Sequence, residues 1–417
     1  MRQAVLQSLP PDNGLYMPEQ IPILPDSFFR NLPTMTFPEI AFRIASSYLE
    51  EDVPPKVLKS IVEEAINFQA PVITIDQKLS ILELFHGPTM AFKDFGARFM
   101  ARLMNYFWSD HKDQLRILVA TSGDTGGAVA AGFHGLDNIE VIILYPKGKV
   151  SQLQEAQLTT WGDNIKALEI DGDFDACQKL VKMAFLDEEL NNSMQLSSAN
   201  SINIARLIPQ TFYYFNAFNQ IKPNTPITFC VPSGNFGNLT AGLLAKKMGL
   251  PIAKVIAATN INDVVPQYLL TSEFHPTRAR VTLSNAMDIG HPSNFARILD
   301  LYGSTWNKIR QDIDGFSVTD EETVDQIKFN HLKNGYVMDP HTAVGTHAAR
   351  QYQITHPESD VIVLSTAHPI KFQSELKDKL SFSIPYPANI NQFLEKPSKK
   401  MSLKSDFEDF KSFLMNS

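Results

Sequence analysis

Residues 115–133 read LRILVATSGDTGGAVAAGF, which is a mostly apolar run, a glycine-containing loop and a helical pattern. Short apolar or β-branched runs recur later, with helix-like segments between them, at residues 141–144, 165–170, 227–231, 254–258 and 360–364. Near-continuous apolar strands that alternate with helices are typical of parallel sheets covered on both faces. We therefore predict an α/β fold whose ligands bind at the carboxyl ends of the strands.

The composition is that of a globular chain of two to three domains, with 417 residues, 44% of them hydrophobic and 20% charged. A net charge of −8 argues against a broad nucleic-acid surface or a polybasic membrane anchor. Two cysteines make neither a disulfide framework nor a four-ligand zinc site, and they suit a reducing compartment. Without a spanning apolar run or a signal-peptide pattern, we expect a soluble, cytoplasmic protein with no nucleic-acid or membrane partner.

Three loops that follow predicted strands carry candidate ligand-binding residues. They are TSGDTGG at 121–127, PSGNFGN at 232–238 and STAHPIKF at 365–372. Each could also be an ordinary turn made of favoured turn residues. The second loop matches neither the dinucleotide fingerprint nor the P-loop. Its backbone N–H groups could still hold a small phosphate without an arginine, because each such bond to a charged group contributes about 1.5–3 kcal/mol.

Lys93 lies in LELFHGPTMAFKDFG, residues 82–96, among phenylalanines and a methionine. Most lysines are solvated surface residues, but these neighbours would desolvate the ammonium and lower its pKa. An amine of this kind is what an imine with an aldehyde cofactor requires. A buried lysine and a phosphate-binding loop on an α/β scaffold together predict pyridoxal 5'-phosphate (PLP) as the cofactor.

The chain resembles the threonine synthases, a PLP-dependent family with the tryptophan-synthase β-like fold, in five ordered motifs. They are LFHGPT…FKD (84–94), the SGDTG loop, SANSINIAR (198–206), the SGNFGN loop and TAHPIKF (366–372). The likeness runs from Asp12 almost to the C-terminus. The family usually has Ala where Ile370 stands, and it usually has a further segment before Asp12, so we expect an early strand to be absent.

The resemblance implies two open, mainly parallel twisted sheets flanked by helices (PLP fold type II), preceded by a helical N-terminal segment. We expect four parts: the helical segment 1–80, a smaller α/β domain 81–215 with the PLP lysine and the substrate-carboxylate loop, a larger α/β domain 216–385 with the PLP phosphate loop, and a C-terminal strap and helix 386–417 capped by Ser405. A hinge is expected near residues 216–226. The aromatic run at 212–218 has helical spacing, which indicates core or a subunit interface.

The resemblance also implies a cofactor site. Lys93 would form the Schiff base with PLP and later move protons. The cofactor phosphate would be held by Ser233, Gly234, Asn235, Phe236, Gly237 and Asn238. Thr366, or Ser365 beside it, would face the pyridine nitrogen with a hydroxyl, which does not enforce a protonated ring.

For the substrate, the resemblance assigns its carboxylate to Ser122, Gly123, Asp124 and Thr125. We expect Ser122 and Thr125 to make the direct contacts, because the Asp124 carboxylate would repel another carboxylate unless it turns away as a helix cap. Candidates for the substrate phosphate are Arg206 and Lys371, with Asn203 and His341 or His368 nearby in the motifs. Arg206 could equally be a buried ion-pair residue.

The implied reaction converts O-phospho-L-homoserine and water to L-threonine and phosphate, by β,γ-elimination of phosphate and then hydration at the β-carbon, as the last step of threonine biosynthesis. Two alternatives stay open: another enzyme of the same fold (threonine dehydratase-like or a phospho-lyase homologue), and a non-catalytic PLP- or anion-binding protein. A monomer or homodimer is expected. No metal is expected, because the calcium-loop-like Asp171–Asp175 has Lys182 where the last carboxylate ligand belongs.

Overall fold

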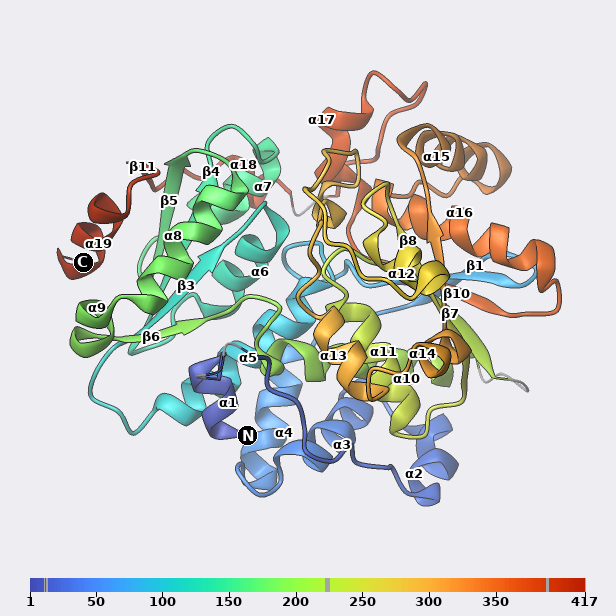
Figure 1. Cartoon of the computed structure of the whole chain (residues 1–417), viewed down its shortest axis with the longest axis horizontal. Coiled ribbons are helices and arrows are strands. Elements are labelled where there is room, and N and C mark those ends of the chain that lie inside the picture. The colour runs from blue at the N-terminus through green and yellow to red at the C-terminus, as the bar shows by residue number, and fades with distance from the viewer. Residues whose placement is uncertain (11, 13, 222–225, 388–389, 417) are drawn as a thin grey trace. The chain divides into compact units, whose positions relative to one another are not determined.

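The computed structural model describes residues 1–10, 12, 14–221, 226–387 and 390–416. By their contacts, the residues form two compact units, each with its own sheet (Figure 1). Unit 1 consists of Met1–Tyr16, Lys93–Arg206 and Tyr386–Ser417, and unit 2 of Met17–Phe92 and Leu207–Pro385. The four-part division expected from the sequence stays a prediction. The hinge expected near residues 216–226 falls in part on residues 222–225, which lie outside the described residues.

Unit 1 contains a five-stranded sheet in which every neighbouring pair is parallel. Its order is β11 (Lys400–Lys404), β5 (Ile165–Asp171), β4 (Ile139–Pro146), β3 (Leu115–Ala120) and β6 (Gln195–Ser198). All residues of β4 are buried, which is why its sequence is almost continuously apolar. The helices of this unit are α1 (Arg2–Gln7), α5 (Lys93–Trp108), α6 (Asp124–Phe133), α7 (Gln152–Thr159), α8 (Phe174–Leu186), α9 (Glu188–Ser193), α18 (Asn391–Leu394) and α19 (Phe407–Asn416).

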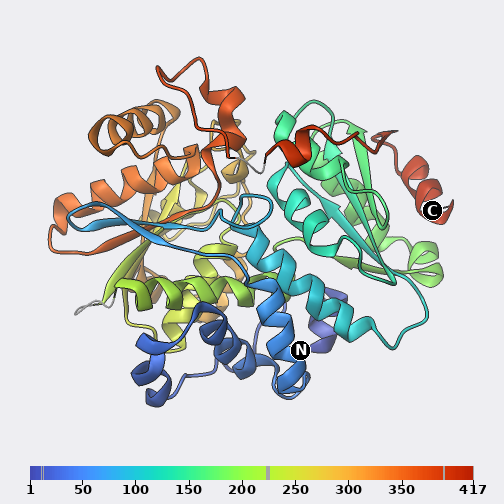
Figure 2. The same cartoon turned by 180° about the vertical axis from the view of Figure 1, so that it is seen from behind.

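Unit 2 contains a six-stranded sheet with parallel pairs except for the antiparallel hairpin β1–β2. Its order is β1 (Val72–Asp76), β2 (Leu79–Glu83), β10 (Val361–Ser365), β7 (Ile227–Pro232), β8 (Ile252–Thr259) and β9 (Ile313–Ser317). In Figure 2 the blue hairpin lies alongside the orange β10. Because β7 and β10 are parallel neighbours, the loops that follow them leave the same edge of the sheet.

The helices of unit 2 fall into two groups, one before the first strand and one after β7. Before β1 lie α2 (Asp26–Asn31), the 3₁₀ turn η1 (Leu32–Thr34), α3 (Phe37–Leu49) and α4 (Pro55–Ala65). The later ones are α11 (Gly237–Lys247), α12 (Val264–Thr271), η2 (Asn285–Met287), α13 (Phe295–Leu301), α14 (Trp306–Asp312), α15 (Asp320–Asn334), α16 (Pro340–Thr355), η3 (Pro369–Phe372) and α17 (Gln373–Leu376). The helix α10 (Ile204–Ile221) contains the division point between the units.

The six predicted strands are all present, as β3, β4, β5, β7, β8 and β10, and two mainly parallel sheets flanked by helices are confirmed. The helical N-terminal segment is confirmed for α1 to α4, but it ends before residue 80 because β1 begins at Val72. The Ser405 cap is wrong: the Asp409 amide donates to the Asp406 carboxylate at 3.1 Å, so the aspartate side chain caps the last helix. The aromatic run at 212–215 is fully buried, which confirms the core interpretation.

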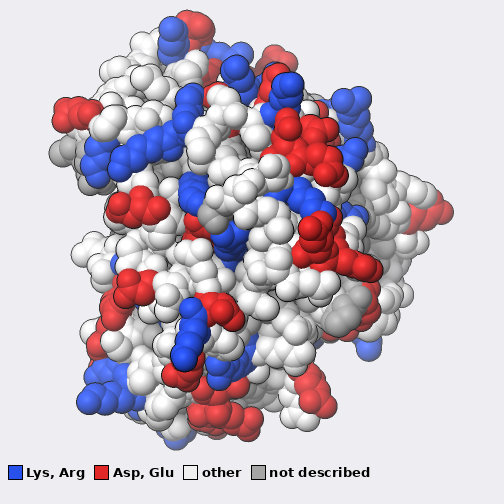
Figure 3. Space-filling model, turned by 90° about the vertical axis from the view of Figure 1, so that its left-hand side faces the viewer, with Lys and Arg blue, Asp and Glu red and all other residues white. Residues whose placement is uncertain are grey.

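Charged residues of both signs are interspersed over the face shown in Figure 3, so the described residues there form no continuous basic surface. Among the described helices, none combines the length and the apolar character needed to cross a membrane. The calcium-loop-like stretch is a helix start, because Asp173 accepts a hydrogen bond from the Ala176 amide at 2.9 Å and caps α8.

Candidate functional site

The loop expected to bind the PLP phosphate, Ser233–Asn238, joins β7 to α11 in unit 2 and is called the phosphate loop here. Phe236 has φ 60° and ψ 8°, a left-handed conformation uncommon for a non-glycine residue, and it turns the chain into the helix. A Cβ at Gly234 would lie 2.6 Å from the Met287 Cα and 2.9 Å from the Ala286 carbonyl oxygen. Backbone atoms cannot yield easily, so only glycine fits there.

Asn238 adds a side-chain donor to this loop. Its Oδ1 accepts hydrogen bonds from the hydroxyls of Tyr213 at 2.6 Å and Tyr214 at 3.0 Å, which fixes the direction of the amide. The buried Nδ2 of Asn238 has no hydrogen-bond partner among the described residues. An unpaired buried donor is costly unless a ligand satisfies it. The first N–H groups of α11 also lack intrahelical acceptors, so the loop fits a phosphate monoester such as the tail of PLP.

The third loop, residues 365–372, follows β10 and holds the predicted ring-nitrogen partners. Ser365 is buried, and its hydroxyl lies 2.8 Å from that of Thr342. The Thr366 carbonyl accepts from the Phe92 amide at 2.9 Å, and the His368 amide donates to the Met90 carbonyl at 3.1 Å. The three residues that precede Lys93 along the chain are therefore paired with this loop.

In this loop region His368 is half-buried and Lys371 is buried. Burial lowers the pKa of His368 to about 4, and its Nδ1 accepts from the Ile370 amide at 3.2 Å. The predicted place of His368 near the substrate phosphate stays a prediction. Lys371 is fully buried, and its ammonium donates to the Thr89 carbonyl at 2.8 Å. Its proposed contact with the substrate phosphate stays a prediction.

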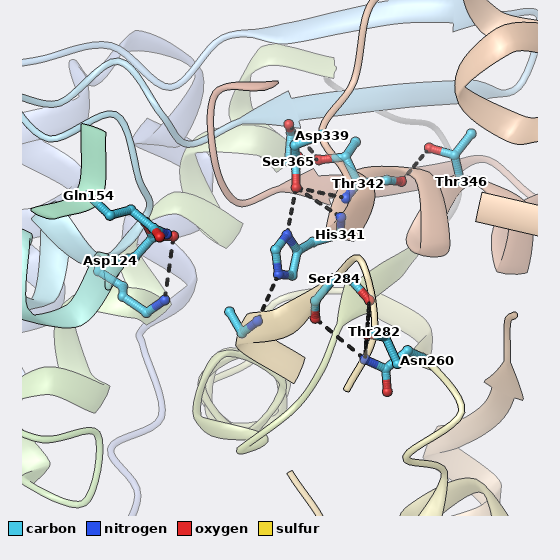
Figure 4. A network of polar contacts seen from close by, with 12 residues as sticks. Asp124, Gln154, Asn260, Thr282, Ser284, Asp339, His341, Thr342, Thr346 and Ser365 are labelled. Atoms are coloured by element: carbon cyan, nitrogen blue, oxygen red, sulfur yellow. Dashed lines mark hydrogen bonds and ion pairs between the residues drawn. The ribbon is translucent and has the colours of Figure 1, made fainter. Parts of the chain in front are cut away.

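His341, the other histidine considered, belongs to a buried polar network at the start of α16 (Figure 4). Its Nδ1 lies 2.8 Å from the Asp339 carboxylate, and its Nε2 lies 3.2 Å from the Ala286 amide nitrogen. The Thr342 hydroxyl donates to the same carboxylate. His341 was expected near the substrate phosphate, and both of its ring nitrogens have partners within unit 2.

In unit 1, Lys93 is the first residue of α5, and its side chain is 15% exposed. Its ammonium lies 3.9 Å from the Asp124 carboxylate. The other oxygen of Asp124 accepts from the Gln154 amide at 3.0 Å. Asp124 therefore turns toward Lys93 and Gln154, and it is a charge partner that the sequence analysis did not give to this lysine.

The first loop begins α6 through Gly123, which has φ 138°. The Thr121 hydroxyl oxygen accepts from the amides of Gly123 at 3.0 Å and Gly126 at 2.9 Å, so it organises the turn. Ser122 and Thr125 are half-buried at the helix start, where free N–H groups favour an anion. Their contact with the substrate carboxylate stays a prediction.

Asn203 and Arg206 lie together in unit 1, since the Arg206 amide donates to the Asn203 carbonyl at 3.0 Å. Asn203 is fully buried, and its side-chain amide donates to the Val5 carbonyl at 2.9 Å and the Ser8 hydroxyl at 2.8 Å. Its polar atoms therefore hold α1 against the 198–203 loop. Arg206 is 2% exposed, and its guanidinium donates to the Ala199 carbonyl at 2.6 Å.

Three groups that hold site residues in place by hydrogen bonds were not predicted from the sequence. Gln154 bonds to Asp124, the Tyr213–Tyr214 pair to Asn238, and Asp339 to His341. A signal existed for the tyrosines, because a buried tyrosine hydroxyl usually needs a partner. The contact of Gln154 with Asp124 joins separate segments, and no local pattern marks it. Asp339 stands two residues before His341, and Asp followed by Pro is a typical helix start, so a signal existed there too.

Comparison with known proteins matches the whole chain. Residues 74–367 match the model of the pyridoxal-phosphate dependent enzymes, residues 1–66 the threonine synthase N terminus, and residues 342–414 the threonine synthase C-terminal region. Threonine synthase from Escherichia coli is 42% identical over 99% of this chain and 96% of its own, and its crystal structure superposes with a TM-score of 0.92. The PLP-bound threonine synthase from Brucella melitensis is 33% identical, with a TM-score of 0.92 over 100% of this chain and 96% of its own.

Proposed function

Because the chain belongs to the threonine synthase family of PLP-dependent enzymes, we propose that it converts O-phospho-L-homoserine and water to L-threonine and phosphate. The reaction breaks the bond between Cγ and the phosphate oxygen and adds water at Cβ. The enzyme class, a PLP-dependent lyase, follows from the family. The substrate and the roles of individual residues are the proposal.

The observation that carries the proposal is the phosphate loop of unit 2, where Gly234 allows close approach and Asn238 holds a buried unpaired donor. When bound, PLP supplies an aldehyde that captures the substrate amine and a ring that withdraws electrons from its Cα. The chain's own residues then have three tasks. Lys93 anchors the cofactor and moves protons, the phosphate loop fixes the tail, and Thr366 faces the pyridine nitrogen.

The substrate carries two anionic groups, a carboxylate and a phosphate, and each is assigned its own set of binding residues. The carboxylate binds at the start of α6 through the hydroxyls of Ser122 and Thr125, because Asp124 is turned to Lys93. The phosphate binds near Arg206 and Lys371, the buried cations of the predicted set. Two cations favour a departing phosphate because its negative charge increases as the bond to Cγ breaks.

Absorbance tests the cofactor assignment. The purified protein should show a visible band from lysine-bound PLP that borohydride removes and that the Lys93→Ala variant lacks. A colourless protein that shows no absorbance change when PLP is added would contradict the proposal. Phosphate release from O-phospho-L-homoserine, matched one to one by L-threonine, then tests the substrate. Deamination of L-threonine in place of this reaction would favour a dehydratase-like enzyme, the alternative from the sequence.

Two finer predictions belong to the same proposal. The two cysteines, Cys177 and Cys230, are buried and free, which suits the reducing cytoplasm expected for the protein. We also keep the expectation of a monomer or homodimer, which sedimentation of the PLP-loaded protein tests directly.

A further inference from the structure

The Asp339 carboxylate lies at the centre of the buried network in unit 2 and is fully buried. It accepts hydrogen bonds from the His341 amide at 2.9 Å, from His341 Nδ1 at 2.8 Å, and from the Thr342 hydroxyl. The amide bond alone is what a helix cap makes, and Asp339 does cap α16. The two side-chain bonds go further, because each partner reaches a different loop.

The first of these bonds leads to the phosphate loop. His341 Nε2 accepts a hydrogen bond from the Ala286 N–H, so the ring proton sits on Nδ1 and is donated to Asp339. The carbonyl of Ala286 and the Cα of Met287 are the atoms that a Cβ at Gly234 would meet. His341 therefore fixes the turn that lies directly behind the phosphate loop.

The second bond, from the Thr342 hydroxyl, leads to the loop at residues 365–372 that is expected to face the pyridine nitrogen. A carboxylate can only accept hydrogen bonds, so the Thr342 hydroxyl donates its proton to Asp339. Thr342 then accepts the proton of the Ser365 hydroxyl, 2.8 Å away. Ser365 also has the Tyr336 hydroxyl within hydrogen-bond reach, so its single proton is used inside this network. An unprotonated pyridine nitrogen needs a donor, so Thr366, the neighbouring hydroxyl, is the residue that can meet it.

We propose that Asp339 is a positioning residue that serves both ends of the cofactor site in unit 2, through His341 toward the phosphate loop and through Thr342 and Ser365 toward the pyridine nitrogen. This inference rests on the proposed function, since it takes these loops as the PLP site. Figure 4 shows the four side chains in one continuous group at the start of α16. If Asp339 only capped the helix, changing His341 or Thr342 would not alter how either loop binds the cofactor.

Two histidine variants separate the bonds at that ring. His341→Asn places an amide donor near Nδ1 and removes the acceptor for Ala286, whereas His341→Gln can reach the Nε2 position and keep that acceptor. Titration of the apo-protein should show PLP binding about tenfold weaker in His341→Asn, the order expected for the loss of the hydrogen bond from the half-buried Ala286 N–H. Binding of pyridoxal, which lacks the phosphate, should stay at the wild-type level. His341→Gln keeps the acceptor for Ala286 but loses the Nδ1 donor to Asp339, so its PLP affinity should lie between those of the wild type and His341→Asn.

Thr342→Val tests the other arm. In the PLP-bound protein it should move the ¹⁵N resonance of the pyridine nitrogen while the ³¹P resonance stays in place, and His341→Asn should do the reverse. Thr346→Val is the matched control, because this buried hydroxyl lies one turn further along α16 and donates to the Thr342 carbonyl at 2.8 Å. It should move neither resonance.

Wild-type protein that binds no PLP would overturn the proposed function. Wild-type protein that binds PLP, with His341→Asn and Thr342→Val keeping its affinity and both resonances, would overturn only the positioning role of Asp339. Equal loss of PLP and pyridoxal binding, in step with a lower melting temperature, would also overturn it, because a merely structural defect has no preference for one end of the cofactor. Where one variant fails to fold, the spectra of the other variant decide.

Discussion

The backbone N–H of Phe92 donates a hydrogen bond to the carbonyl oxygen of Thr366 at 2.9 Å. An antiparallel bridge between Ala91 and Ala367 supports the same pairing. Lys93 follows Phe92 directly, and consecutive Cα atoms are about 3.8 Å apart. The backbone of the candidate Schiff-base lysine is therefore tied, through its neighbour, to the loop that carries the candidate ring-nitrogen partner.

Replacing Lys93 by arginine tests the lysine with little disturbance of charge. Arg keeps a cation that can meet Asp124, now 3.9 Å from the ammonium, but its guanidinium is always protonated and forms no imine. We expect a folded protein with a near-wild-type melting temperature, no visible absorption band, and activity lower by more than about a thousandfold. Residual activity near the wild-type rate would show that Lys93 is not the anchor of PLP.

Asn238→Asp tests the phosphate loop by exchanging one atom. The Oδ1 that accepts from Tyr213 and Tyr214 is kept, but the unpaired Nδ2 becomes an oxygen. A carboxylate beside a phosphate dianion replaces a donor with a repulsive charge, so PLP should bind about a hundredfold more weakly in an equilibrium titration.

The matched control is Tyr213→Phe, which removes one hydrogen bond to Oδ1 and leaves Nδ2 in place. It should weaken PLP binding by less than about tenfold. If both variants bind PLP alike, Nδ2 does not face the cofactor.

Ser122→Ala and Thr125→Val test the predicted carboxylate contacts at the start of α6. Each should raise KM for O-phospho-L-homoserine about tenfold, because one hydrogen bond to a charged group is lost, and should change kcat less. Asp124→Asn is the comparison, since its Oδ1 can still accept from Gln154. We expect no rise in KM for this variant. A rise in KM only for Asp124→Asn would assign the carboxylate to a different set of donors.

Four of the five strands that the sequence did not reveal lie at an edge of their sheet. The edge strands of the two sheets are β1, β6, β9 and β11, and none was predicted, whereas every predicted strand is internal. An internal parallel strand is buried on both faces and reads as a continuous apolar run. β11 reads KMSLK and is mostly exposed, and β9 reads IDGFS, so neither carries that pattern. The hairpin strand β2, next to the β1 edge, was missed as well.

The candidate site divides in the same way. The loops after β3 and β7 could be found in the sequence because glycine, serine and asparagine at strand ends form a local pattern. The loop after β10 was found because its Ser365 and Thr366 hydroxyls come directly at the end of an apolar run. The contacts of Lys93 with Asp124, of Asn238 with Tyr213, and of His341 with Ala286 each join separate segments. Such pairs depend on how the elements pack, and a single sequence does not specify them.

The last prediction concerns pH and the turn behind the phosphate loop. Burial raises the pKa of Asp288 to about 6, although hydrogen bonds from Thr282 and Asn260 oppose this. An unfolded aspartate has a pKa of about 3.9, so the folded protein holds this proton more tightly. The stabilising effect is complete below about pH 4 and is lost as the pH rises through about 6. The free energy of unfolding of the wild type, relative to Asp288→Asn, should therefore fall between pH 4 and 7.

Asp76→Asn provides a control of opposite sign in the same unit. The Lys333 ammonium holds the pKa of Asp76 at about 2, so its carboxylate stabilises the folded protein above about pH 4, and this effect is lost as the pH falls toward 2. Urea denaturation across pH 3–8 gives the free energy of unfolding of the wild type relative to each variant. Relative to Asp76→Asn it should change only at the acidic end, and relative to Asp288→Asn it should change between pH 4 and 7. A flat Asp288 difference over that window, with the Asp76 control behaving as expected, would mean that the Asp288 proton is not held in the folded state. The turn behind the phosphate loop would then not respond to pH through this carboxyl.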